Sequence, residues 1–342
     1  MFNFYEKNIA LGSLTASTIY YIIVIIVASE LVASSSDDLR KWYPPTFIGS
    51  VVLGFITNLP DIFIIIAAAL TSSGVLALGA LLGGNALAFT LGYFFVIIAN
   101  AHFNKSDLYL PKDLRVQLAF LVVAAALVLA LSLFGAFYFW SGFVMLALFA
   151  AYIFSGINGE KLRQGKLEQR LNQFSSSDRK VIRSLIKPNK KQVAGVTLKL
   201  ATAVFIFTYT ASPFVSSIVK LSATLGFPSV YMAALLIPLA AEAPELVSSF
   251  VLSKKSSEAA SIAVSNMVGS KIQSNTLILG LAVVMNSLLG RNFLIGKHFY
   301  FVALLIAVNL YGFKATYDLV LTKRDALFSL LHPVVIIFMM FV

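Results

Sequence analysis

Two uncharged stretches constrain the fold of this chain more than any other feature. Residues 62–104 and 116–159 each contain no Asp, Glu, Lys or Arg. About 20 residues of helix cross the roughly 30 Å hydrocarbon core of a bilayer, so each stretch is long enough for two crossings. Only 12% of the 342 residues are charged and the mean hydropathy is +0.88, whereas a soluble domain carries about 25% charged residues. We therefore expect a membrane protein.

The apolar stretches are continuous, and they lack the alternation of polar and apolar residues that marks the strands of a membrane barrel. Helices then satisfy the backbone inside the bilayer. We expect an all-α polytopic membrane protein with about ten transmembrane helices. The first apolar run is too long for a cleavable signal and lacks a basic start, so we interpret it as a helix. The expected spans are 13–34, 46–70, 75–99, 116–134, 137–157, 197–220, 229–252, 258–286, 294–313 and 326–342.

Basic residues predict the orientation. With the N-terminus outside, 20 of the 26 Lys and Arg residues fall in inner loops and 4 in outer loops, while Lys199 and Lys271 lie within spans. Because Lys and Arg favour cytoplasmic loops, we expect both termini outside the cell membrane and a cytoplasmic central loop, residues 159–196. The net charge of +11 is spread between spans, which is not the pattern of a nucleic-acid-binding face.

The basic central loop divides the chain into two sets of five helices, residues 1–158 and 197–342. A duplicated unit with an odd number of spans must insert in opposite orientations. Inverted repeats of this kind place a substrate site near the middle of the membrane, at interrupted helices. We therefore expect two inverted five-helix repeats.

Short motifs that occur once in each half support the duplication. Residues 57–61 (TNLPD) correspond to 241–245 (AEAPE), and residues 79–85 correspond to 265–271. The spacing from Asp61 to Gly84 is 23 residues, and the equivalent spacing in the second half is 25. The two repeated regions are expected over about residues 50–99 and 233–285.

Four acidic residues fall within spans: Glu30, Asp61, Glu242 and Glu245. Charges inside a membrane are costly and usually mark a functional pathway. Asp61 and Glu245 each follow a proline, which is expected to break the helix and free backbone carbonyls. Carboxylate and carbonyl oxygens suit a hard cation such as Ca²⁺ or Na⁺. The alternative is that each proline only kinks its helix; for Glu30, near the inner helix end, we favour a solvated role.

Further polar residues accompany these acids. Glu242 and Glu245 are three apart and share a helix face. The span 258–286 carries a polar stripe that fits either contact with an ion or hydrogen bonding between helices, and Gly83-Gly84 fits close helix packing as well as a site. The candidate cation ligands are Asp61, Glu245, Glu242, Thr57, Asn58, Asn85, Ser270, Gln273 and Ser274.

These motifs resemble the repeated motifs of the cation/calcium antiporter superfamily, which includes Na⁺/Ca²⁺ and H⁺/Ca²⁺ exchangers. The family motifs read like G-T-S-L-P-E and G-N-x-x-G-S-N-x-x-[ND] in each half; here they correspond to Thr57–Asp61 with Gly83–Asn85, and to Pro244-Glu245 with Asn266–Ser270. The resemblance implies alternating access, with helices 2, 3, 7 and 8 forming the site and helices 1 and 6 sliding across it. It also implies that the two motif acids are the central Ca²⁺ ligands.

The chain departs from the family pattern on both sides of the site. The first acid is Asp instead of Glu, and Gly84 and Ala88 stand where Ser and Asn are expected. Lys271 replaces an Asn, Ser274 replaces an acid or amide, and Glu242 replaces a small hydroxyl. The three carboxylates give a formal charge of −3, or −2 if Lys271 faces them, and either suits one divalent cation. Such a cluster of like charges also makes proton binding competitive with metal binding.

We therefore expect a secondary active antiporter that exchanges Ca²⁺ for H⁺ or Na⁺, with H⁺ slightly favoured because helix 3 has few polar groups. A tethered-cation role for Lys271 is left open. The alternative is a non-transporting relative whose degraded site serves sensing or assembly. We expect no enzyme, since no catalytic triad, zinc spacing or phosphate loop is present, and no permanently bound cofactor. The expected partners are inorganic cations and the bilayer; the sequence leaves the oligomeric state open.

Overall fold

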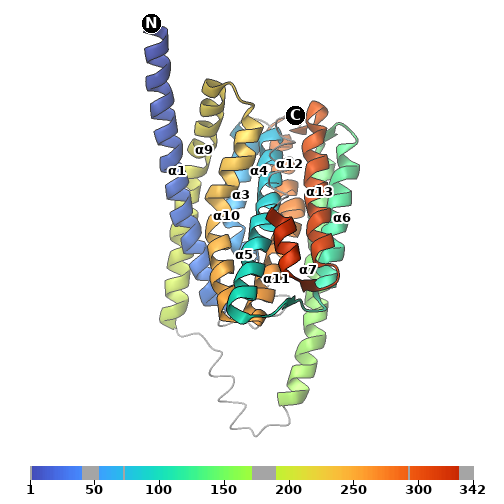
Figure 1. Ribbon diagram of the computed structural model, residues 1–342. Helices are drawn as coiled ribbons and strands as arrows, with labels where there is room; N and C mark the ends of the chain where they lie inside the picture. Colours follow the sequence, from blue (N-terminus) through green and yellow to red (C-terminus); the bar gives the residue numbers. More distant parts are fainter. Residues whose placement is uncertain (1, 41–53, 72–73, 172–189, 292, 331–342) are drawn as a thin grey trace.

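The chain forms a bundle of long helices. The computed structural model describes residues 2–40, 54–71, 74–171, 190–291 and 293–330 (Figure 1). Its α-helices are α1 (Phe2–Arg40), α3 (Leu59–Thr71), α4 (Gly74–Leu87), α5 (Tyr93–Ala99), α6 (Leu114–Ser132), α7 (Phe139–Leu171), α9 (Lys190–Leu225), α10 (Ser229–Lys255), α11 (Ser257–Gln273), α12 (Leu279–Leu288) and α13 (Phe299–Thr316).

The prediction of an all-α polytopic membrane protein is confirmed. Within the described ranges, eight helical stretches are long and apolar enough to cross a membrane, and α3 is a shorter apolar helix. Several helices run past the predicted ends; the predicted span 75–99 continues to Asn104, for example. Hydropathy marks only the apolar part, whereas hydrogen bonding continues a helix beyond it. The predicted residues 46–53 and 331–342 lie outside the described part of the chain.

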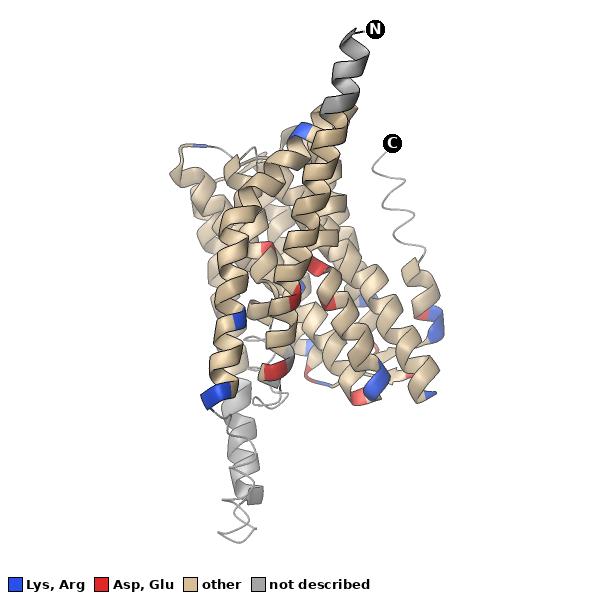
Figure 2. Cartoon of the chain, turned by 90° about the vertical axis from the view of Figure 1, so that its left-hand side faces the viewer, with Lys and Arg blue, Asp and Glu red and all other residues tan. Residues whose placement is uncertain are grey.

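Two composite helices form the centre of the bundle. α4 continues through the π-helical segment η1 (Ala88–Gly92) into α5, and α11 continues through η3 (Ser274–Ile278) into α12. Every residue from Leu76 to Asn85 and from Ala263 to Thr276 is buried. Figure 2 shows some Asp and Glu at mid-height and others in the lower part of the bundle, where most of the Lys and Arg also lie.

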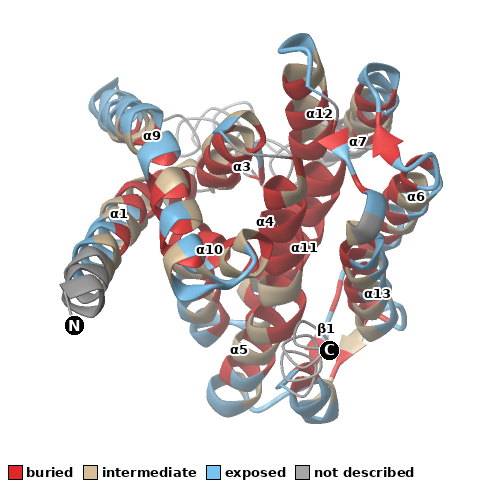
Figure 3. Ribbon diagram, turned by 90° about the horizontal axis from the view of Figure 1, so that it is seen from above, coloured by how far each residue is buried: buried red, intermediate tan, exposed pale blue. Residues whose placement is uncertain are grey.

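α1 and α9 lie side by side at one edge of the bundle (Figure 3). α1 also contacts α10, and α9 contacts α3, so each of the two peripheral helices packs against a proline-containing helix of the opposite half. Both are far less buried than α4 or α11. The polar helices thus occupy the protected centre and the apolar ones face outward, as expected where lipid is the surrounding solvent.

Two short antiparallel ribbons make the inverted repeat visible. β1 (Leu108–Tyr109) pairs with β4 (Val320–Leu321), and β2 (Ala136–Phe137) pairs with β3 (Phe293–Leu294). β1 and β3 occupy equivalent connections of the two halves, as do β2 and β4. Exchanging the halves therefore converts one ribbon into the other. α6 separates β1 from β2, so the ribbons lie at opposite ends of the bundle.

Two of the three π-helical segments in the described part of the chain, η1 and η3, follow the same symmetry; the third is η2 (Asn100–Asn104). η1 begins three residues after Asn85, and η3 begins three residues after Lys271, the equivalent position in the second half. A π-turn inserts an extra residue into a helix and frequently lies at a functional site. Both central helices thus change their winding just beyond the repeated motif.

Close packing between α4 and α10 explains two glycines of the first motif. A Cβ atom added to Gly83 would lie 1.9 Å from the carbonyl oxygen of Ala234 and 2.7 Å from Cγ of Pro238, and one added to Gly79 would lie 2.5 Å from the carbonyl oxygen of Val230. Pro238 has no N–H, so it leaves the Ala234 carbonyl without its usual helical donor. The packing interpretation of Gly83 therefore fits the structure.

Gly83→Ala is expected to destabilise the protein, because the added methyl group collides with backbone atoms of α10. The cost should be about 2 kcal/mol or more, measured as a loss of thermal stability in detergent. Gly195→Ala is the matched control, since a Cβ atom at Gly195 meets nothing within 4 Å and should stabilise α9 by about 0.5 kcal/mol. Equal effects of the two variants would contradict the packing argument.

Candidate cation site

The two proline-acid sequences lie on α3 and α10, and the expected helix break is wrong for α10, whereas α3 begins after a turn at Asn58. α10 stays one continuous helix through Pro244. In the first half the chain is helical over residues 54–57 and turns at Asn58, where the N–H of Asn58 still donates to Gly54 O at 3.0 Å and that of Ile62 to Asn58 O at 2.9 Å. Each proline removes only its own donor, because packing on both sides holds the helix together.

A buried ion pair lies where α3, α10 and α11 meet. Nζ of Lys271 donates to Oε1 of Glu242, and the Asp61 carboxyl lies within hydrogen-bonding reach of the Glu242 carboxyl. Lys271 is 1% exposed, Glu242 is 4% exposed and Asp61 is 7% exposed. The two motif helices and the polar helix thus bring one cation and two acids together in the interior.

Asn58 joins the turn before α3 to α11. It accepts a hydrogen bond from Oγ of Ser270 at 2.6 Å, and its Nδ2 donates to the Ser270 carbonyl and to Oε1 of Gln273, each at 3.3 Å. Thr57 and Ser274 instead bond to backbone carbonyls of their own helices, Gly54 at 3.2 Å and Ser270 at 3.1 Å. The structure therefore brings Asn58, Ser270 and Gln273 together, with Thr57 and Ser274 beside them.

The equivalent contact in the other half is different. By the repeated motifs, Glu242 corresponds to Asn58 and Gly84 corresponds to Ser270. Gly84 has no side chain to bond to Glu242; a Cβ atom built on it would lie 2.6 Å from Oε1 of Glu242 and 3.7 Å from Nζ of Lys271. The ion pair thus occupies the space that Gly84 leaves open.

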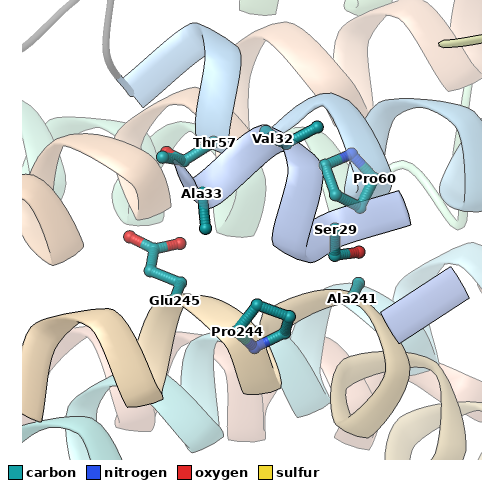
Figure 4. Close-up of a pocket in the computed structure, with 8 residues that line it drawn as sticks. All are labelled: Ser29, Val32, Ala33, Thr57, Pro60, Ala241, Pro244 and Glu245. Carbon is teal, nitrogen blue, oxygen red and sulfur yellow. The ribbon is translucent and has the colours of Figure 1, made fainter. Parts of the chain in front are cut away.

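Glu245, three residues after Glu242 on α10, lies in a small cavity covered by α1. In Figure 4 its carboxylate points toward Thr57 and Ala33. The volume open to the centre of a water molecule is about 10 Å³, which is room for about one water. The lining residues are Ser29, Val32, Ala33, Thr57, Pro60, Ala241, Pro244 and Glu245. Glu30, the fourth acid, is exposed on α1.

Asn85 belongs to a cluster of buried amides. Its Nδ2 donates to Leu81 O at 2.8 Å, and Asn85 and Asn275 exchange two hydrogen bonds of 3.4 Å. Asn275 also donates to Oδ1 of Asn309 at 2.9 Å. The sequence analysis overlooked Asn275 and Asn309, although a lone Asn within an apolar span is a usable signal.

The nine candidate ligands do not form one ready-made cage. Among the residues that the structure describes, no three acidic or imidazole side chains converge as a metal-binding group. Lys271 forms an ion pair with Glu242, and Glu245 faces the cavity under α1. Asn85 bonds to another buried amide, Asn275. The assignment of these residues as cation ligands stays a prediction.

Acidic residues at the centre of two inverted helical repeats define the architecture of a polytopic secondary transporter. The family model described as "Sodium/calcium exchanger protein" matches residues 13–157 and 196–342. The chain belongs to this family.

Solved structures share the fold. The H⁺/Ca²⁺ exchanger CAX is 18% identical, with a TM-score of 0.73 over 93% of this chain and 80% of its own. Native YfkE is 14% identical, with a TM-score of 0.71 over 95% and 91%. The sodium-calcium exchanger NCX_Mj, soaked with Na⁺ and Sr²⁺, is 16% identical, with a TM-score of 0.63 over 95% and 97%. No curated protein sequence matches significantly.

Ser270→Ala should destabilise the protein by about 1 to 2 kcal/mol, because it leaves the buried Asn58 amide without its shortest hydrogen bond. The control is Ser265→Ala, since the Ser265 hydroxyl donates to the Ser261 carbonyl of its own helix, at 3.0 Å, and not to another helix of the described chain. Thermal unfolding in detergent measures both. If Ser265→Ala cost as much as Ser270→Ala, the contact between α11 and Asn58 would be unimportant.

Proposed function

We propose that the protein is a secondary active antiporter that exchanges Ca²⁺ for H⁺ or Na⁺ by alternating access. The observation that carries this proposal is the placement of Asp61 and Glu245 at equivalent positions of α3 and α10, in the interior of the inverted repeat. Membership of the sodium/calcium exchanger protein family supports cation antiport in general.

The charges and donor atoms of the site suit a divalent cation. Asp61, Glu242 and Glu245 with Lys271 sum to a formal charge of −2, which one Ca²⁺ would neutralise. Carboxylate, amide and hydroxyl oxygens are the ligands that Ca²⁺ prefers. In the proposal Asp61 and Glu245 are the central ligands, and the other oxygens come from the remaining candidates: Glu242, Thr57, Asn58, Asn85, Ser270, Gln273, Ser274 and backbone carbonyls.

The edge position of α1 and α9 supports alternating access. α1 covers the cavity that contains Glu245 with Ser29, Val32 and Ala33 (Figure 4). The two edge helices contact each other and are the least buried long helices of the described chain. In the proposal they slide as a pair across α3 and α10, which opens the site to one side of the membrane at a time.

The first half offers few groups for additional Na⁺ ions, which favours H⁺ as the counter-ion. Gly84 and the buried Ala88 contribute no side-chain oxygen, and Asn85 is bonded to Asn275. Among the structural neighbours, CAX is an H⁺/Ca²⁺ exchanger and NCX_Mj is a sodium-calcium exchanger. Their low identity leaves the choice to experiment.

We also propose that the protein lies in the cell membrane with both termini outside and residues 159–196 in the cytoplasm. The basic residues of the described chain gather toward the end of the bundle where α9 begins (Figures 1 and 2). Lys and Arg are enriched on the cytoplasmic side of membrane proteins. Accessible cysteine tags that place the central loop outside would overturn this orientation.

Asp61→Asn and Glu245→Gln should each reduce Ca²⁺ flux by about 100-fold or more, since the loss of a charged ligand costs roughly 3 kcal/mol. The measurement is isotope uptake into reconstituted vesicles under H⁺ and Na⁺ gradients. Glu30→Gln is the matched control, because Glu30 is exposed on α1 and should keep wild-type flux.

Two results would contradict the proposal. Retained exchange in Asp61→Asn or Glu245→Gln would remove these residues from the site. Wild-type protein that binds Ca²⁺ but carries no cation under any gradient would instead support the non-transporting alternative. The ion pair of Glu242 with Lys271 favours that alternative, because it engages one of the candidate ligands.

Glu242→Gln should change the choice of counter-ion or the pH dependence of flux more than it changes folding. Lys271 keeps favourable electrostatic interactions with Asp61 and Glu245 in this variant, so its charge stays compensated. Flux is compared under separate H⁺ and Na⁺ gradients. A profile identical to that of the wild type, at equal stability, would show that Glu242 takes no part in ion exchange.

A further inference from the structure

Lys271 is a cation built into the centre of the proposed site. It is 1% exposed and lies in the fully buried stretch from Ala263 to Thr276. Its ammonium group bonds to Glu242 and interacts favourably with Asp61 and Glu245. All three acids proposed to bind a transported ion therefore already interact with a positive charge that belongs to the protein.

The ammonium group lies in a space that the repeat leaves open. In one half, the Ser270 hydroxyl meets Asn58; in the other, Gly84 provides no side chain, and Oε1 of Glu242 with Nζ of Lys271 fills the gap. Serine at residue 84 would have to share this space with the ion pair. The Glu242–Lys271 ion pair thus fits beside Gly84, but not at the equivalent position beside Ser270.

Stability alone gives a weak reason for keeping this pair. Replacing a buried ion pair with uncharged residues is often neutral or stabilising, because removing both charges from water is costly. Charged residues within membrane spans usually mark an ion pathway. The charge of Lys271 is therefore better explained by the ions that its neighbours bind.

We propose that Lys271 is a tethered cation that occupies one monovalent-cation position of the site. The inference rests on the proposed function, because it assumes that Asp61 and Glu245 bind transported cations. It adds that the chain supplies one positive charge itself, so the site needs one fewer monovalent ion than its three carboxylates would otherwise require.

Removing the tethered charge should create a requirement for a dissolved one. Lys271→Gln changes the formal charge of the four-residue cluster from −2 to −3, and a small monovalent metal ion can take the vacated position. The double variant Glu242→Gln with Lys271→Gln returns the charge to −2. Lys199→Gln is the matched control, because Lys199 forms a 3.1 Å ion pair with Asp38 at the edge of the bundle, where both side chains are about one-third exposed.

The experiment measures the unfolding temperature of each purified protein in detergent, with NaCl or choline chloride at equal ionic strength and one fixed alkaline pH. We expect NaCl to raise the unfolding temperature of Lys271→Gln by about 5 °C, with saturation, as for a ligand present well above its Kd. The wild type, the double variant and Lys199→Gln should differ between the two salts by a much smaller amount.

Each outcome decides the proposal. A saturable Na⁺ response confined to Lys271→Gln supports it, as does recovery of folded Lys271→Gln in NaCl but not in choline chloride. The same response in all four proteins, or no added response in folded Lys271→Gln, overturns it. Lys271→Gln that is unfolded in both salts while the double variant folds would make the pair purely structural, which also overturns it.

This readout separates the inference from the proposed function, because unfolding temperatures do not depend on transport. A wild-type protein without flux would overturn the antiporter proposal and leave the Na⁺ response of Lys271→Gln to be judged by itself. A wild-type antiporter whose Lys271→Gln variant ignores Na⁺ would overturn only the tethered cation.

Discussion

The buried ion pair between Lys271 and Glu242 constrains the arrangement of the surrounding helices more than any other contact. A charge in a bilayer must face the protein interior and find a partner. That demand fits the central position of α11, which is polar along one stretch and yet buried from Ala263 to Thr276. It also fits Gly84, since any side chain there would collide with the carboxylate. The apolar helices α1 and α9 are then left for the edge of the bundle.

The architecture could be predicted from the sequence because lipid restricts the alternatives. Uncharged stretches of this length can only be buried as spanning helices, and an odd number of spans per half forces the repeats to be inverted. The motif around Asp61 and its counterpart around Glu245 then placed both acids near the centre. Helix ends were less predictable, because hydrogen bonding continues α9 and the helical stretch from Gly74 to Asn104 beyond their apolar parts.

The contacts of the site were harder to predict, because each depends on residues far apart in the sequence. Glu242 meets Lys271 beside Gly84, from the other half, where an added Cβ atom would lie 2.6 Å from Oε1 of Glu242. Asn85 looked like a ligand from its motif, yet its amide bonds to Asn275, which in turn bonds to Asn309. The rule that proline breaks a helix failed at Pro244 because neighbouring helices support α10 on both sides. Sequence analysis identified which residues are polar, while tertiary packing decided their partners.

The two ribbons have a consequence for how the molecule is assembled. Each joins a strand of the first half to a strand of the second, and together they tie α6 to α13 at both ends of the bundle. α6 from the first half and α13 from the second half, joined by a ribbon at each end, thus form a closed frame. Neither half can complete the frame alone, so this arrangement requires both halves of the chain. The frame lies on the opposite side of the molecule from the edge helices α1 and α9 (Figure 3).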